Sequence, residues 1–256
     1  MNFTDEQLKA AKDLLLKMAD DQLILGHRNS EWTGLGPILE EDIAFSSMAQ
    51  DKIGHSFAIY QILNKMGEAD PDTLAFNRKE SDMKCCHLVE YPIGDYSFSL
   101  MRHFLFDEAD AIRFELLVNS SLKDLTDVAK KFRGEIKYHT MHAETWIIQL
   151  SEGNEESKAR MQSALNECFP LALGIFEPSG HEEVLISANI FAGEKLLMKK
   201  WLTRIESVVE KAKLILPDVD SLNASYGGRK GYHTEYLKPL LDEMTEVYSI
   251  DPEAEW

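Results

Sequence analysis

Residues 38–66 read ILEEDIAFSSMAQDKIGHSFAIYQILNKM, and this stretch decides the fold. Its apolar residues recur every three or four positions, which is the period of an amphipathic helix, whereas a half-buried strand would alternate strictly. Almost no segment of the chain alternates in that way. The sequence therefore predicts an all-α protein, with further helices at 4–29, 97–120, 125–150, 155–176, 182–216 and 234–248.

Glycine and proline separate these predicted helices. GLGP at 34–37 follows the first helix, and a loop after the second helix runs through Pro71. The segment SDMKCCHLVEYPIGDYSF at 81–98 is the least regular part of the chain, and its Pro92 and Gly94 predict a loop. Pro170 is expected to kink or divide its helix. The stretch SYGGRKGYH at 225–233 lacks the spacing of a phosphate-binding loop and is also interpreted as a loop. Because no linker divides the chain, we predict a single domain over 1–256.

The charge and the cysteines restrict the functional class. The chain has 27 basic and 44 acidic residues, a net charge of −17, and no basic run, which argues against nucleic acid or an anionic membrane as a partner. Cys85, Cys86 and Cys168 lack the CxxC spacing of a zinc site and indicate a reducing compartment. We find no signal peptide and no apolar run near the ~18 residues of a membrane span, so a cytoplasmic location is expected.

Acids and histidines interrupt the apolar face of each of the first four predicted helices. Residues seven apart on a helix differ by about 20° of rotation and those four apart by about 40°, so each set shares one face. We therefore expect these groups to meet inside a four-helix bundle. They are Asp21 on the first helix, Asp51 and His55 on the second, Asp107 on the third, and Glu135 and His139 on the fourth.

This layout is typical of ferritin-like di-iron proteins, in which two helices each give one carboxylate and two give Glu-x-x-His. Here each histidine follows its acid at the fourth position instead of the third, and Asp51 and Asp107 are shorter than Glu. The six residues are therefore vestigial metal-ligand candidates. One interpretation has the acids and histidines paired with one another, for example Asp51 or Glu135 with His139. In another, the helices are rotated so that some of these residues face solvent.

The chain resembles, from end to end, the family of non-catalytic C subunits of the multicomponent phenylacetyl-CoA 1,2-epoxidases, which belong to the ferritin-like superfamily. Together the matching segments are specific, although each alone would indicate only a ferritin-like bundle. They are LILGHRNSEW (23–32), GPILEEDIAFSSMAQDKIGH (36–55), LVEYPIGDYSFSLMRHFLFD (88–107), EIKYHTMHAETWIIQLSEGNEESKARMQSAL (135–165) and GGRKGYHTEYLKPLLDEM (227–244).

The resemblance implies a ferritin-like four-helix bundle with additional C-terminal helices and a role in aerobic phenylacetate catabolism. In such enzymes a catalytic subunit of the same fold holds the di-iron centre, activates O2 and epoxidises the ring of the CoA thioester. A reductase with a flavin and an iron–sulfur cluster supplies electrons. The resemblance therefore implies a structural subunit with no cofactor of its own, bound to the catalytic subunit in a heterodimer or a larger heteromer.

Two other functions remain open at this stage. The chain could itself be a di-iron or manganese oxygenase or oxidase, in which case it would bind metal tightly. It could also be a ferritin-like storage or stress protein, which predicts a symmetric homo-oligomer and iron uptake. The long helical extension beyond the four-helix unit argues against storage.

Overall fold

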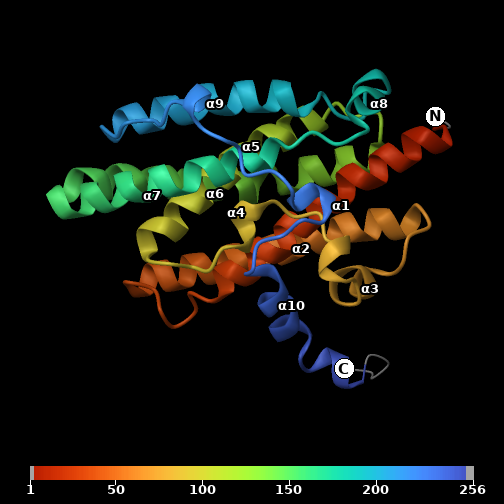
Figure 1. Ribbon diagram of the computed structural model, residues 1–256, viewed down its shortest axis with the longest axis horizontal. Coiled ribbons are helices and arrows are strands. Elements are labelled where there is room, and N and C mark those ends of the chain that lie inside the picture. The colour runs from red at the N-terminus through yellow and green to blue at the C-terminus, as the bar shows by residue number, and fades with distance from the viewer. Residues whose placement is uncertain (1–2, 252–256) are drawn as a thin grey trace.

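The computed structural model describes residues 3–251, and all regular structure in this range is helical (Figure 1). Four long helices form the bundle: α1 (Asp5–Ser30), α2 (Leu39–Lys65), α5 (Tyr96–Leu117) and α6 (Lys123–Gly153). Helix α1 packs against α2, α5 packs against α6, and α2 also contacts α6. The all-α, ferritin-like fold predicted from the sequence is confirmed.

Additional helices cover one side of this bundle. Helices α7 (Glu155–Leu173) and α9 (Glu194–Lys211) both pack against α5, on the side away from α1 and α2 (Figure 1). Trp201 of α9 is fully buried there and stacks on Phe169 of α7, with ring centroids 5.7 Å apart. These contacts bury α5 on nearly all sides, which explains why polar side chains on α5 need partners from within the protein.

Local sequence explains where several helices begin. Thr4 and Gln7 form a reciprocal capping box at the start of α1, Asn154 and Ser157 form one at α7, and Asp95 caps α5. Each cap satisfies backbone N–H groups that have no partner within the helix. Beyond each cap, apolar side chains recur with the helical period, so that one face of each helix lies in the core.

The chain between α2 and α5, which includes the predicted loop at 81–98, contains three short helical segments: α3 (Pro71–Phe76), η1 (Glu80–Asp82) and α4 (His87–Glu90). Asp70 caps α3 by accepting the Thr73 N–H at 3.0 Å, and Pro71 fits the first turn of a helix because its missing N–H has no partner there. Pro170 lies inside α7 close to its end, and the turn η2 (Gly174–Phe176) follows directly.

The prediction of one helix over 182–216 is wrong. The chain instead forms α8 (Glu182–Ser187) and α9, separated by a turn in which Asn189 has φ +54° and Gly193 has φ +96°. The turn buries Ile190 and Phe191. Because these two residues continue the apolar spacing of a helix, the sequence pattern does not indicate that the helix is interrupted here. The predicted last helix, 234–248, is shorter as well and is present as α10 (Leu237–Thr245), followed by η5 (Tyr248–Ile250).

Between α9 and α10 the chain runs back across the bundle, through η3 (Val219–Ser221) and η4 (Gly228–Lys230) (Figure 1). Its glycines allow close approach to the segment before α4: a Cβ on Gly228 would lie 2.1 Å from the carbonyl oxygen of Cys85. On Gly231, whose φ is +82°, a Cβ would lie 2.3 Å from the Ser81 carbonyl oxygen. The glycine-rich stretch is therefore a packing element. None of the described helices is long and apolar enough to cross a membrane.

Candidate functional site

Four of the predicted site residues form two hydrogen-bonded pairs between α2 and α6. His55 Nε2 lies 2.7 Å from Glu135 Oε2, and His139 Nε2 lies 3.0 Å from Asp51 Oδ2. Because α2 and α6 run antiparallel, each histidine meets the acid of the opposite helix and not the acid of its own. The interpretation in which these acids and histidines pair with one another agrees with these contacts.

Asp107 of α5 lies at the centre of the same polar region. Its carboxylate contacts the Nδ1 atom of His103 and the ammonium group of Lys52, and the Nδ1 atom of His139 lies 3.8 Å away. The side chains of Lys52 and Asp107 are both 0% exposed. The Lys52 ammonium also lies 3.6 Å from Asp110. We call the set Asp51, Lys52, His55, His103, Asp107, Glu135 and His139 the polar seam.

The electrostatics of the polar seam follow from its burial and its cations. Burial alone raises the pKa of Asp107, but His103 and Lys52 outweigh it and hold that pKa well below its usual range. Burial lowers the pKa of His55 to about 2, and Lys52 acts in the same direction. Burial likewise lowers the pKa of His103 to about 4, against the pull of Asp107. His55 is therefore a neutral donor to Glu135, and Lys52 supplies the fixed positive charge.

The sixth candidate, Asp21, is held by the C-terminal segment. Both its carboxylate oxygens accept hydrogen bonds from the Arg229 guanidinium at 2.7 Å, and the Cys86 N–H donates to it at 2.8 Å. The expectation that all six residues would meet in one cluster is thus wrong for Asp21. The sequence could not show this pairing, because Arg229 lies 208 residues further along the chain.

The polar seam does not fit a di-iron centre as it stands. Within residues 3–251, no three of its acids and histidines bring ligand atoms within 4.8 Å of one another. The Lys52 ammonium contacts the Asp107 carboxylate, where an iron would need that oxygen. A buried cation of the chain itself therefore neutralises the central carboxylate. Sequence reasoning missed Lys52 because lysine is rarely buried and normally indicates an exposed position.

The polar seam opens onto a surface with unusual apolar content. The side chains of Asp51 and Glu135 are 30% and 43% exposed at this opening. On the same two helices, Ile43, Phe57 and Tyr138 are 62%, 49% and 42% exposed. Large exposed apolar patches on a protein mark interaction sites. The α2–α6 face, as we call it, consists of Leu35, Ile38, Leu39, Ile43, Ile53, Phe57 and Tyr138.

A groove of about 640 Å³ lies on the other side of α6, between α5, α6 and α9. It is lined by Glu108, Phe114, Glu144 and Arg204, among others. Among residues 3–251, neither carboxylate oxygen of the buried Glu108 has a hydrogen-bond partner. Burial raises the pKa of Glu108 to about 8, and neighbouring Glu144 acts in the same direction. This carboxyl group is therefore largely protonated at neutral pH.

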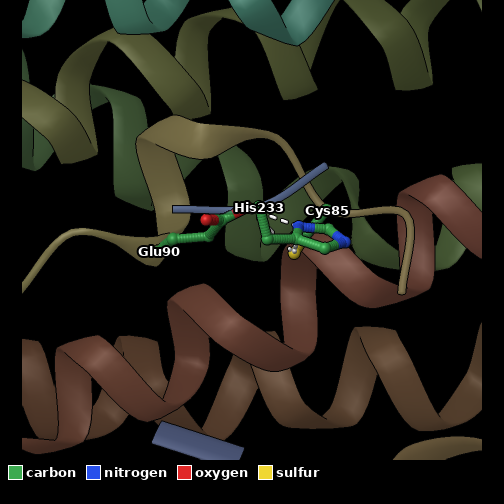
Figure 2. Close-up of side chains that lie close together, drawn as sticks. All are labelled: Cys85, Glu90 and His233. Atoms are coloured by element: carbon green, nitrogen blue, oxygen red, sulfur yellow. Dashed lines mark hydrogen bonds and ion pairs between the residues drawn. The ribbon is translucent and has the colours of Figure 1, made fainter. Parts of the chain in front are cut away.

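A second cluster of potential ligands lies away from the polar seam. Figure 2 shows Cys85, Glu90 and His233 with their side chains pointing toward one another. Among residues 3–251, this is the group of three whose ligand atoms all lie within 4.8 Å of one another. Cysteine spacing gave no signal for it, because His233 lies 143 residues beyond Glu90.

Comparisons with known proteins place the chain in a family. A family model described as "Phenylacetic acid catabolic protein" matches residues 1–256. Among curated proteins, the chain is 29% identical over 242 residues to the C subunit of 1,2-phenylacetyl-CoA epoxidase from Escherichia coli (strain K12). The match covers 94% of this chain and 97% of that relative.

Proposed function

Because the chain belongs to the phenylacetic acid catabolic protein family, we propose that it is the non-catalytic subunit of a cytoplasmic phenylacetyl-CoA 1,2-epoxidase complex. In this role it binds and positions a catalytic di-iron subunit of the same fold. The reductase, with its flavin and iron–sulfur cluster, and the CoA thioester belong to the assembled complex. The similarity to one subunit of such an epoxidase, over nearly the full length of both chains, supports the proposal.

The contact between Lys52 and Asp107 is the observation that carries the non-catalytic assignment. O2 activation needs a redox metal, and a metal site of this kind uses carboxylates as anionic ligands. Here the ammonium group of Lys52 compensates Asp107, and the imidazoles of His139 and His55 lie within hydrogen-bonding distance of Asp51 and Glu135. Releasing these carboxylates for a metal would leave Lys52 as an uncompensated buried charge, which is costly.

The α2–α6 face supports the second half of the proposal, the binding of the catalytic subunit. Leu39, Ile43, Ile53 and Phe57 follow one another at steps of four, ten and four residues along α2, so they form one stripe. Tyr138 of α6 extends the face, because its ring lies 6.3 Å from the ring of His139, which contacts α2. A stable interface between two helical subunits typically buries more than about 2,000 Å², and a partner on this face would also cover the opening of the polar seam.

The two alternative functions have weaker support. A di-iron or manganese oxygenase needs carboxylates that are free to bind metal, whereas Asp51, Asp107 and Glu135 each contact a cationic or imidazole partner. A storage protein would need the same ligands. Both alternatives predict tight metal binding in the polar seam, and metal analysis of the purified chain after aerobic iron loading separates them from the scaffold.

The test is co-purification with the catalytic subunit of the same organism. Ile43→Glu and Phe57→Glu place charges on the α2–α6 face, and we expect each to weaken the complex at least tenfold, as truncating an interface hot spot does. Ile215→Glu is the matched control, because Ile215 is 77% exposed but lies after α9, away from this face. Separate elution of the wild-type proteins at micromolar concentration would refute the proposal. Equal binding by Phe57→Glu and the control would refute the assigned face.

A further inference from the structure

The cluster of Cys85, Glu90 and His233 joins three parts of the chain. Cys85 lies just before α4, Glu90 ends α4, and His233 belongs to the segment after η4. All three side chains are 0% exposed. The Sγ atom of Cys85 lies 3.6 Å from Glu90 Oε1 and 3.9 Å from His233 Nδ1, and the latter two atoms are 2.8 Å apart (Figure 2).

These separations are close to those of a tetrahedral zinc site. Zinc–ligand distances of about 2.3 Å for sulfur, about 2.0 Å for nitrogen and about 2.1 Å for oxygen give ligand–ligand distances of about 3.6 Å to sulfur and about 3.4 Å between nitrogen and oxygen. The Cys85–Glu90 distance of 3.6 Å already agrees. The Cys85–His233 distance of 3.9 Å would shorten by about 0.3 Å, and the His233–Glu90 distance of 2.8 Å would lengthen by about 0.6 Å.

Neighbouring groups orient two of the three ligand atoms toward the cluster. His233 Nε2 donates to the Met83 carbonyl oxygen at 3.1 Å, which leaves Nδ1 directed at the cluster. The backbone N–H and the hydroxyl of Thr234 both donate to Glu90 Oε2 at 2.7 Å, which leaves Oε1 directed at the cluster. Outer hydrogen bonds of this kind are what orient the ligands in protein metal sites.

The charge balance also allows a divalent cation. His233 Nδ1 lies 2.8 Å from Glu90 Oε1, and His233 Nε2 lies 3.1 Å from the Met83 carbonyl oxygen. Burial raises the pKa of the Cys85 thiol. On binding, a divalent cation would displace the thiol proton to solvent, so that a thiolate, a carboxylate and a neutral imidazole surround two positive charges. The bound site would then hold no uncompensated buried charge.

We propose that Cys85, Glu90 and His233 form a binding site for a thiophilic divalent cation of the Zn²⁺ class. The site is separate from the polar seam and does not depend on the proposed function. Its bound cation would tie the C-terminal segment at 231–236 to the segment at 83–90, and so hold the crossing that also brings Arg229 to Asp21.

The test uses the full-length chain without a histidine tag, after chelator treatment under reducing conditions. Co²⁺ is titrated as a spectroscopic probe and Zn²⁺ as the competitor. We expect one Co²⁺ per chain with a thiolate-to-cobalt charge-transfer band that Zn²⁺ abolishes. Cys85→Ser and His233→Gln should each lower the affinity at least tenfold, as loss of a ligand does. Cys86→Ser is the matched control, because Cys86 is also buried and adjacent but lies outside the cluster.

Zn²⁺ should also raise the melting temperature of the wild type and of Cys86→Ser, but not that of Cys85→Ser. The absence of a charge-transfer band in the wild-type chain at stoichiometric Co²⁺ would overturn the proposal. This wild-type measurement does not depend on whether the variants fold. A band that persists in Cys85→Ser would overturn it as well.

Discussion

Replacement of Lys52 by methionine is the perturbation that best probes the polar seam. Met keeps most of the apolar stem of lysine and removes the ammonium group, so the buried Asp107 carboxylate loses its fixed positive partner. Removing one partner of a buried ion pair costs about 3–5 kcal/mol. Asp107 keeps its contacts with His103 and His139, so we expect the lower end, about 3 kcal/mol.

For a chain of this size, about 3 kcal/mol corresponds to a fall in melting temperature of roughly 6–12 °C. Calorimetry and urea denaturation of Lys52→Met, Asp107→Asn and the double variant measure it. The double variant should recover most of the loss, because it removes the unpaired charge at position 107, and Asp110 keeps its hydrogen bond from Gln22. The reasoning would be refuted if Lys52→Met cost less than about 1 kcal/mol, or if the two substitutions were simply additive.

Two further predictions concern other buried charges. Burial raises the folded-state pKa of Glu108 to about 8 from an ordinary value of 4.5. The folded chain therefore binds this proton more tightly than the unfolded chain does. The stability of the folded protein accordingly falls as the pH rises from 4.5 to about 8. Glu108→Gln should therefore stabilise the protein by roughly 2–4 kcal/mol at pH 8 and leave its stability unchanged at pH 4, as measured by urea denaturation. Equal effects at both pH values would contradict the conclusion that the Glu108 carboxyl group is protonated in the folded protein. Arg229→Lys should lower the free energy of unfolding by at least about 2 kcal/mol in the same assay, because an ammonium group cannot reproduce the bidentate contact with Asp21. A urea midpoint equal to that of the wild type would contradict a stabilising role for this contact.

The helical period located the residues of the polar seam but not their partners. It placed Asp51, His55, Glu135 and His139 on inward faces, because a mid-helix acid or histidine at apolar spacing is visible in one sequence. The pairing of His55 with Glu135 depends on the antiparallel register of two helices, which no local pattern encodes. The burial of Lys52 was not predicted, because nothing in the sequence distinguishes a buried lysine beside Asp51 from an exposed one.

Long-range contacts account for the other differences between expectation and structure. Asp21 lies on the predicted helix, but its partner Arg229 is brought back by the crossing segment after α9. The break between α8 and α9 depends on the positive φ angles of Asn189 and Gly193, in a stretch whose apolar spacing continues without interruption. Cys85 and His233 meet for the same reason as Asp21 and Arg229, since the crossing segment lies against the residues before α4.

The central claim is that the polar seam of this chain takes no part in the oxidation chemistry. The most direct measurement is NADPH-dependent epoxide formation from phenylacetyl-CoA by the reconstituted complex, with reductase present, using wild-type chain, Asp51→Asn or His139→Gln. Turnover per assembled, iron-replete complex should equal that of the wild type for both variants, and mixtures without this chain should lose most of their activity. Abolished turnover in a fully assembled, iron-replete complex carrying Asp51→Asn would contradict the claim.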